Sequence, residues 1–117
     1  MAFFHIPLPE THELYKELWA ANPAHAAICF GEPITGFGPN YGMFDKMKEL
    51  QSTTHIFFGH DHVNVLDSEY QGIRFVYGLK SSMCSYFDKK KIGTTLITIK
   101  DNIDTGKLNI IIDFNYY

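Results

Sequence analysis

The spacing of apolar residues along the chain predicts two helices. In residues 10–21 the apolar positions recur at the 3.6-residue spacing of a helix, with glutamates on the other positions. Residues 41–51 repeat this pattern, and Asn40 is a candidate cap for that second helix. The expected stripes are Leu14, Tyr15, Leu18 and Trp19 in the first helix, and Met43, Phe44, Met47 and Leu50 in the second.

Other apolar runs predict strands rather than helices. Residues 2–6 and 54–58 are nearly continuous in apolar side chains, as in strands covered on both faces, and residues 73–77 predict a further strand. Residues 94–100 and 108–114 are expected to pair as a hairpin, because Asp104-Thr105-Gly106 between them has turn chemistry.

The order of these elements indicates an α/β or α+β fold, with helices packed against a sheet. Residues 22–42 interrupt every periodic pattern with glycine and proline, so we expect a long loop there. Long loops inside a compact domain often carry function.

Composition excludes some classes of protein. The chain has 117 residues, of which 45% are hydrophobic and 20% charged, so we expect one globular domain or part of one. A formal net charge of −3 gives no reason to expect nucleic-acid binding. No signal peptide or membrane segment is recognisable, which leaves the compartment open with the cytoplasm favoured. Lys89-Lys90-Lys91 predicts a solvated turn, and Cys29 and Cys84 predict small buried residues.

The strongest chemical signal is Gly59-His60-Asp61-His62, which follows the strand predicted at 54–58. Histidines at i and i+2 of an extended chain point the same way, and imidazole is a common ligand for transition metals. Gly59 allows a sharp turn there. A polar loop with two ordinary histidines remains the alternative to a metal site.

His5 adds a third imidazole at the end of the first strand. It either satisfies a hydrogen bond in the core or ligates a metal, and a parallel pairing of strands 2–6 and 54–58 would bring it near His60. His12, His25 and His55 are not assigned to the chemistry. Asp61 points the other way by alternation, so we expect it to orient the metal ligands or support the loop rather than to bind the metal. Asp67 and Glu69 are expected in a solvated loop.

These residues resemble a known family. Phe3-Phe4-His5-Ile6-Pro7-Leu8-Pro9-Glu10 and Phe57-Phe58-Gly59-His60-Asp61-His62-Val63-Asn64 are similar to the C-terminal half of calcineurin-like metallophosphoesterases, in the branch of the purple acid phosphatases. Trp19, Gly31-Glu32, Gly42-Met43-Phe44 and Tyr77-Gly78 occur in the corresponding order. The resemblance covers roughly residues 1–87.

The resemblance implies a fold, a site and a cofactor. The fold is a four-layer α/β/β/α sandwich, of which residues 1–117 would form the C-terminal part. His5 and His60 would ligate one metal and His62 the other, while Asn64 would line the substrate mouth. The intact family holds two metals, divalent or mixed-valence and drawn from Mn, Fe and Zn, and hydrolyses phosphate esters with a metal-bridged hydroxide.

The chain lacks the first three family motifs, among them the carboxylate that bridges the metals. Two hypotheses therefore stay open. One is a metal-dependent phosphoesterase of which this chain supplies the three histidines, with little activity alone. The other is a non-catalytic half-domain that associates with a second copy or with the missing N-terminal half, since a half-domain exposes strand edges and an apolar face.

Overall fold

Four strands form the central sheet of the computed structural model, which describes residues 1–36 and 38–117. Their spatial order is β1-β2-β4-β3, with β1 and β4 parallel to β2 and with β3 antiparallel to β4. The parallel pairs β1/β2 and β2/β4 place several strand ends at one edge of the sheet. The four strands are β1 (Ala2–Phe3), β2 (His55–Phe58), β3 (Leu66–Tyr70) and β4 (Ile73–Tyr77).

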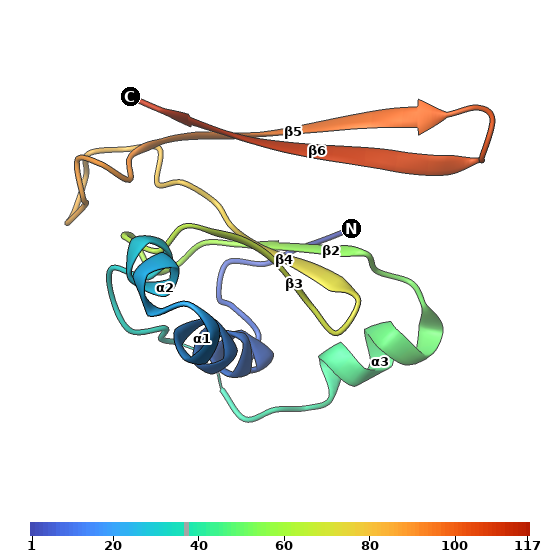
Figure 1. Ribbon diagram of the computed structural model, residues 1–117, viewed down its shortest axis with the longest axis horizontal. Helices are drawn as coiled ribbons and strands as arrows, with labels where there is room; N and C mark the ends of the chain where they lie inside the picture. The colour runs from blue at the N-terminus through green and yellow to red at the C-terminus, as the bar shows by residue number, and fades with distance from the viewer. Residues whose placement is uncertain (37) are drawn as a thin grey trace.

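Three helices lie on one side of this sheet (Figure 1). The first helix has the predicted bounds, and Leu14 on its apolar stripe is buried against the sheet. The third is shorter than predicted, because the left-handed Gly42 (φ 75°), rather than Asn40, stands at its N-terminus. Asn40 instead accepts a hydrogen bond from the Gly42 amide at 2.8 Å. The helices are α1 (Glu10–Ala21), α2 (Pro23–Cys29) and α3 (Met43–Leu50).

A long hairpin lies on the side of the sheet opposite the helices (Figure 1). It consists of β5 (Gly93–Asn102) and β6 (Lys107–Tyr116), which confirms the predicted pairing and its turn. The register puts one set of apolar side chains on a single face. That face comprises Ile97, Ile99, Leu108, Ile110, Ile112, Phe114 and Tyr116.

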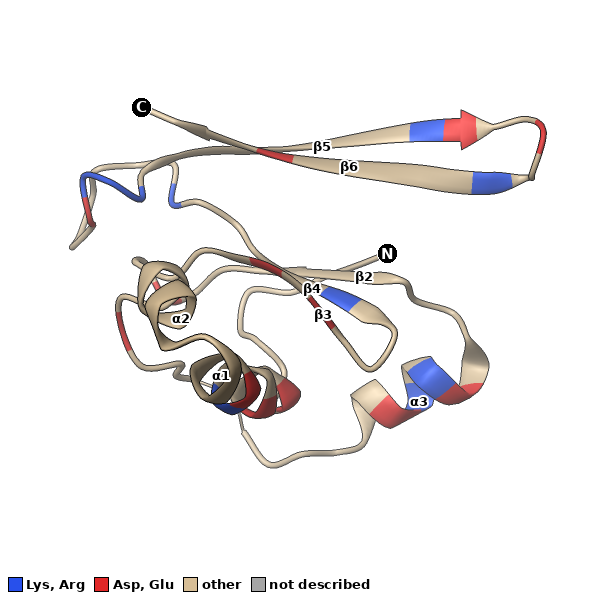
Figure 2. Cartoon of the chain, viewed as in Figure 1, with Lys and Arg blue, Asp and Glu red and all other residues tan. Residues whose placement is uncertain are grey.

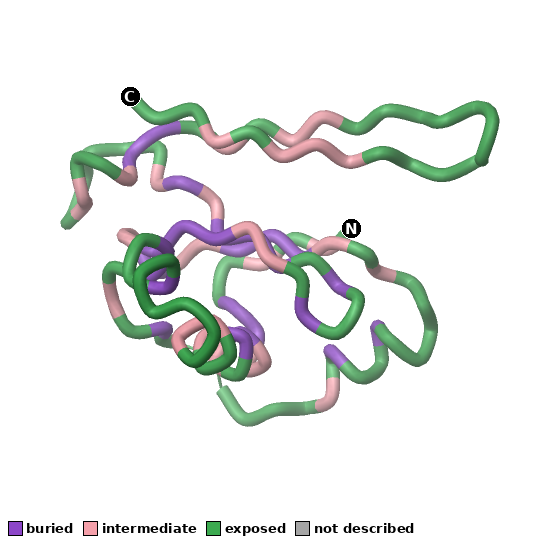
Figure 3. The backbone as a smooth tube through the Cα atoms, in the orientation of Figure 1, coloured by how far each residue is buried: buried purple, intermediate pink, exposed green. Residues whose placement is uncertain are grey.

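The core lies between the helices and the sheet. Buried stretches gather there in Figure 3, whereas the hairpin is intermediate or exposed along most of its length. Phe75, in the middle of β4, is 0% exposed, and its ring contacts the rings of Phe44, Phe58 and Tyr70 at centroid distances of 5.7, 5.9 and 5.8 Å. Mixed strands with helices on one side confirm the predicted α+β class.

One helix and one strand were not predicted. Helix α2 begins where the sequence indicated only a loop, because the Asn22 side chain accepts a hydrogen bond from the His25 amide at 3.1 Å and Pro23 starts the first turn. Strand β3 replaces the solvated loop expected around Asp67. A two-residue turn with positive φ at Gln71 (48°) and Gly72 (85°) joins β3 to β4.

Four smaller predictions also need correction. The first strand is only two residues long, and Phe3 within it is exposed rather than buried. Cys29 is buried as predicted, but Cys84 is exposed. Asp67 is not a solvated loop residue, because its carboxylate accepts hydrogen bonds from Arg74 across the β3/β4 pair. Lys91 does not point into solvent, because its side chain folds inward to bind backbone carbonyl groups.

Charges are distributed unevenly over the molecule. In the cartoon of Figure 2, acidic residues predominate on α1 and acidic and basic residues are mixed on α3, whereas the hairpin carries most of its charged residues near its tip. Within residues 1–36 and 38–117, no helix combines the length and the apolar character needed to cross a membrane.

Candidate functional site

The parallel pairing of β1 and β2 brings His5 next to His60. Phe3 is in register with Phe57, and the two chains stay together beyond the strands through a hydrogen bond from the Gly59 amide to the His5 carbonyl, at 3.2 Å. As a result, His5 Nε2 lies 3.3 Å from His60 Nδ1, with the rings nearly perpendicular at 87°. The structure confirms the expectation that parallel strands would place His5 beside His60.

The sharp turn of the loop falls on His60 itself. His60 has φ of 73°, a left-handed conformation that is unusual for a residue with a side chain, whereas Gly59 was expected to provide the turn. The His60 ring also packs tightly against Gly36, where a Cβ atom would lie 2.5 Å from His60 Nε2. Glycine at position 36 therefore leaves the space that the ring occupies.

His62 lines the same cavity but is turned toward a different loop. Its ring stacks on Tyr86 at a centroid distance of 4.4 Å, and its Nδ1 lies 3.2 Å from the Tyr86 carbonyl oxygen. The Tyr86 hydroxyl in turn donates a hydrogen bond to Glu32 at 2.8 Å, and this bond raises the pKa of Tyr86. Of the three predicted ligands, the structure therefore brings His5 and His60 together and holds His62 apart from them.

Asp61 fixes the loop after β2, which carries His60 and His62, through buried hydrogen bonds. It is 4% exposed, and its carboxylate accepts hydrogen bonds from the Thr35 amide (3.3 Å), the Thr35 hydroxyl (2.6 Å) and the Tyr77 hydroxyl. Burial, and then the contact with Asp61, raises the pKa of Tyr77 above its usual range. Both carboxylate oxygens are used in this way, so Asp61 acts as a structural anchor between the two histidines.

Asn64 is buried within the loop after β2, whereas the resemblance implied a position at the mouth of a substrate site. It is 1% exposed, and its side-chain oxygen accepts a hydrogen bond from the Glu32 amide at 3.1 Å. The Glu32 carboxylate in turn accepts a hydrogen bond from the Val63 amide at 3.0 Å. These reciprocal bonds join the loop after β2 to the loop after α2, where the sequence had indicated only an irregular segment.

The sequence reasoning did not identify four side chains that position the site: Glu32, Thr35, Tyr77 and Tyr86. Gly31-Glu32 and Tyr77-Gly78 appeared only as supporting pieces of the resemblance. Thr35 and Tyr86 carry no local signal, because their roles depend on contacts with residues 26 and 24 positions away in the chain.

The three histidines line a cavity of about 230 Å³ at the ends of the parallel strands. Among the described residues, no group of three or more His, Cys, Asp or Glu side chains has an arrangement that could hold a metal ion. The two imidazoles of His5 and His60 are the pair of predicted ligands that lie close together here. The walls include His5, His60, Asp61, His62, Ser81 and Ser82.

The fold and this cavity define a mixed α/β protein with a histidine-lined site at the ends of parallel strands. Over 77 residues, 66% of its length, the chain is 32% identical to a protein of Arabidopsis thaliana named "Probable inactive purple acid phosphatase 14". That similarity supports a relationship of the purple-acid-phosphatase kind over the matched stretch. The stretch spans 18% of the Arabidopsis protein. No family model matches the chain, and no solved structure matches it.

Proposed function

We propose that this chain is a metal-binding segment of the purple-acid-phosphatase kind that does not hydrolyse phosphate esters by itself. The observation that carries the proposal is the 3.3 Å separation of His5 Nε2 and His60 Nδ1 at the ends of two parallel strands. Similarity to a protein that is itself named "Probable inactive" supports the second half of the proposal.

The separation of the two nitrogens suits a shared cation. Two imidazoles bound to one tetrahedral zinc, each with a Zn–N distance of about 2.0–2.1 Å, place their nitrogens about 3.3 Å apart. Such a cation would take the place of the imidazole–imidazole hydrogen bond. His62 could join as a third ligand only after its ring leaves Tyr86, so the site needs a local rearrangement to become complete.

The missing carboxylate is the reason to expect no turnover. A bridging anion holds two dications close together in a dinuclear centre, since it offsets their repulsion. Asp61 belongs to the wall of this cavity, but its oxygens already bind Thr35 and Tyr77. The described residues around the cavity thus offer imidazoles, hydroxyls and the ammonium group of Lys80, and no unused carboxylate.

Zinc titration of the purified chain tests the metal site. We expect one equivalent to bind, and we expect His5→Ala and His60→Ala each to weaken binding by at least about tenfold, since each removes one of two ligands. His62→Ala is expected to have a smaller effect. Calorimetry measures the affinity, and elemental analysis after gel filtration measures the stoichiometry.

His55→Ala is the matched control, because His55 lies on β2 but outside the cavity. Equal affinity in the wild type and in both His5 and His60 variants would rule out this site. Hydrolysis of p-nitrophenyl phosphate is measured in parallel with Mn, Fe and Zn. Turnover that depends on the added metal, and that disappears in His60→Ala, would show that the chain is a phosphoesterase after all.

A second candidate function is association with another chain. Ile99 and Leu108, on the apolar face of the hairpin, are 49% and 59% exposed, and a β-strand pair with an open apolar face favours self-association. We expect dimers or larger species in sedimentation velocity at micromolar concentrations. Ile99→Lys combined with Leu108→Lys should shift the chain to monomers, whereas Leu50→Lys on α3 should not. A wild-type chain that sediments as a monomer would refute this role.

A further inference from the structure

A second cavity lies away from the histidines, between α2, β3 and the hairpin. Its volume is about 530 Å³, within the range of about 300–1,000 Å³ that is typical of small-molecule sites. None of His5, His60 and His62 contributes to its wall. Its ligand would therefore be independent of the proposed metal site.

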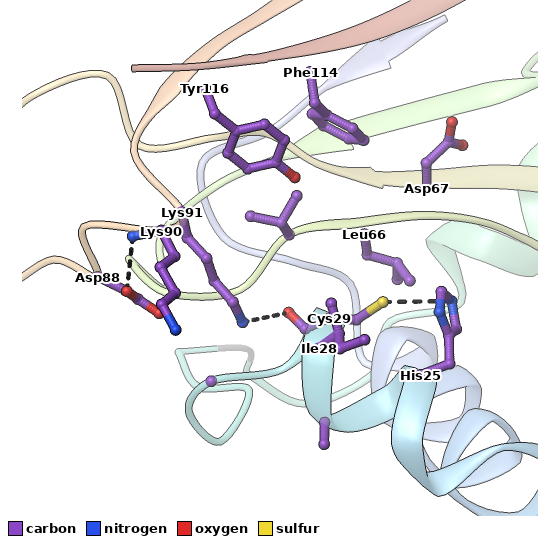
Figure 4. A pocket seen from close by; sticks show the side chains of 13 residues that line it. His25, Ile28, Cys29, Leu66, Asp67, Asp88, Lys90, Lys91, Phe114 and Tyr116 are labelled. Carbon is purple, nitrogen blue, oxygen red and sulfur yellow. Dashed lines mark hydrogen bonds between the residues drawn. The ribbon is translucent and has the colours of Figure 1, made fainter.

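Apolar side chains from three separate parts of the chain form most of this wall. Figure 4 shows Phe114 and Tyr116 of β6 directed toward Leu66 of β3, with Ile28 of α2 on the far side. Ile28 is exposed although it is a large aliphatic residue. Covering this surface with an apolar molecule would remove it from water, which is favourable in proportion to the area covered.

One end of the cavity carries positive charge. The Lys91 ammonium donates hydrogen bonds to the carbonyl oxygens of Val63 (2.9 Å) and Cys29 (3.3 Å). An ammonium group has three N–H donors, so one remains for a ligand. No described carboxylate forms an ion pair with Lys91. Burial lowers the pKa of Lys91, since a charged group loses hydration there.

The remaining charges at this cavity leave a positive excess. Lys90 adds a second ammonium group, and its amide donates to the Asp88 carboxylate at 2.9 Å. Asp67 also lines the cavity, but Arg74 already binds both of its oxygens. The cavity therefore has two ammonium groups and one carboxylate, that of Asp88, without a basic side-chain partner. This balance of charge favours binding of an anion over binding of a cation or a neutral molecule.

We propose that this cavity binds a small amphipathic anion, with its charged head on Lys90 and Lys91 and its apolar body between Ile28, Leu66 and Phe114. A medium-chain carboxylate has this chemistry. The head would accept the remaining Lys91 N–H, while the chain would cover the two rings of β6.

Titration of the isotopically labelled full chain with octanoate tests this proposal. We expect the amide NMR signals of Leu66, Lys91 and Phe114 to shift in a saturable way. Octanol, which is neutral, and octylammonium, which is cationic, should each bind at least about tenfold more weakly, because neither offers an anion to the lysines. Lys91→Met should weaken octanoate binding by a similar factor.

Lys89→Met is the matched control, since Lys89 is adjacent in sequence but lies outside the cavity wall. If Lys91→Met loses the dispersed spectrum of the folded chain, Lys90→Met replaces it, because the Lys90 side chain is exposed. Three results would overturn the proposal: no saturable shifts, equal binding of octanoate and octanol, or shifts confined to the histidine cavity.

Discussion

Replacing Phe75 by alanine is expected to lower the free energy of unfolding by about 3–5 kcal/mol, the usual cost of removing a buried phenylalanine. The ring is fully buried and meets the rings of Phe44, Phe58 and Tyr70, so its loss leaves a cavity where helix α3 packs on the sheet. The neighbouring rings cannot close that cavity without leaving their rotamer positions. Urea denaturation followed by circular dichroism measures the change.

Tyr41→Ala is the control for this substitution, because it removes an aromatic ring of similar size from an exposed position. We expect it to change the free energy of unfolding by less than about 0.5 kcal/mol, as is usual for surface substitutions. Similar losses in Phe75→Ala and Tyr41→Ala would show that the core does not lie between α3 and the sheet.

Asp61→Ala is expected to lower the free energy of unfolding by about 2–4 kcal/mol, since it leaves buried donors on Tyr77 and Thr35 without an acceptor. The Tyr77 hydroxyl is the most costly of these, because no part of that residue is exposed to water. The same substitution should weaken zinc binding, since Asp61 fixes the loop that carries His60 and His62. Urea denaturation and zinc calorimetry measure the two effects.

A double-mutant cycle with Tyr77→Phe separates the contribution of the Asp61–Tyr77 hydrogen bond to the free energy of unfolding from that of the other Asp61 contacts. When the hydroxyl is absent, Asp61→Ala should cost at least about 1 kcal/mol less than it does in the wild type, because one of the stranded donors is gone. Asp113→Ala, at an exposed position of the hairpin, controls for the loss of a carboxylate. A cycle with no interaction energy would contradict the anchoring role of Asp61.

Local sequence was a reliable guide where an element buries one continuous stripe or run. Helix α1 has the predicted bounds because the apolar stripe from Leu14 to Trp19 is long enough to define its period. Strand β4 was predicted at the correct residues for a similar reason, since all of its residues except Arg74 are buried. The hairpin followed from its turn and from two apolar segments of matched length.

Sequence was a poor guide where short elements depend on distant partners. Helix α2 has only seven residues and no periodic stripe of its own, so it depends on the Asn22 cap and on packing against α1. Strand β3 is rich in polar residues, and it becomes a strand by pairing with β4 and through the ion pair between Asp67 and Arg74. In both cases tertiary contacts outweigh the local signal.

The candidate site shows the same division. The spacing of His60 and His62 after an apolar run, and the position of His5 before Pro7, were enough to select the three histidines. The pairing of β1 with β2 then decided which of them meet, because the register of two strands is a property of the whole sheet. The orientation of His62 depended on Tyr86, 24 positions further along the chain.

The sequence by itself determined the α+β class, the bounds of α1 and β4 and the pairing of the hairpin, and it selected the three histidines as candidates, since these follow from local periodicity and residue chemistry. Only the tertiary structure decided that Asp61 is an anchor, that Asn64 is buried and that Lys91 points into a cavity. The reason is physical: a polar side chain is directed by the partner that satisfies it once it is buried, and in this protein those partners come from distant parts of the chain.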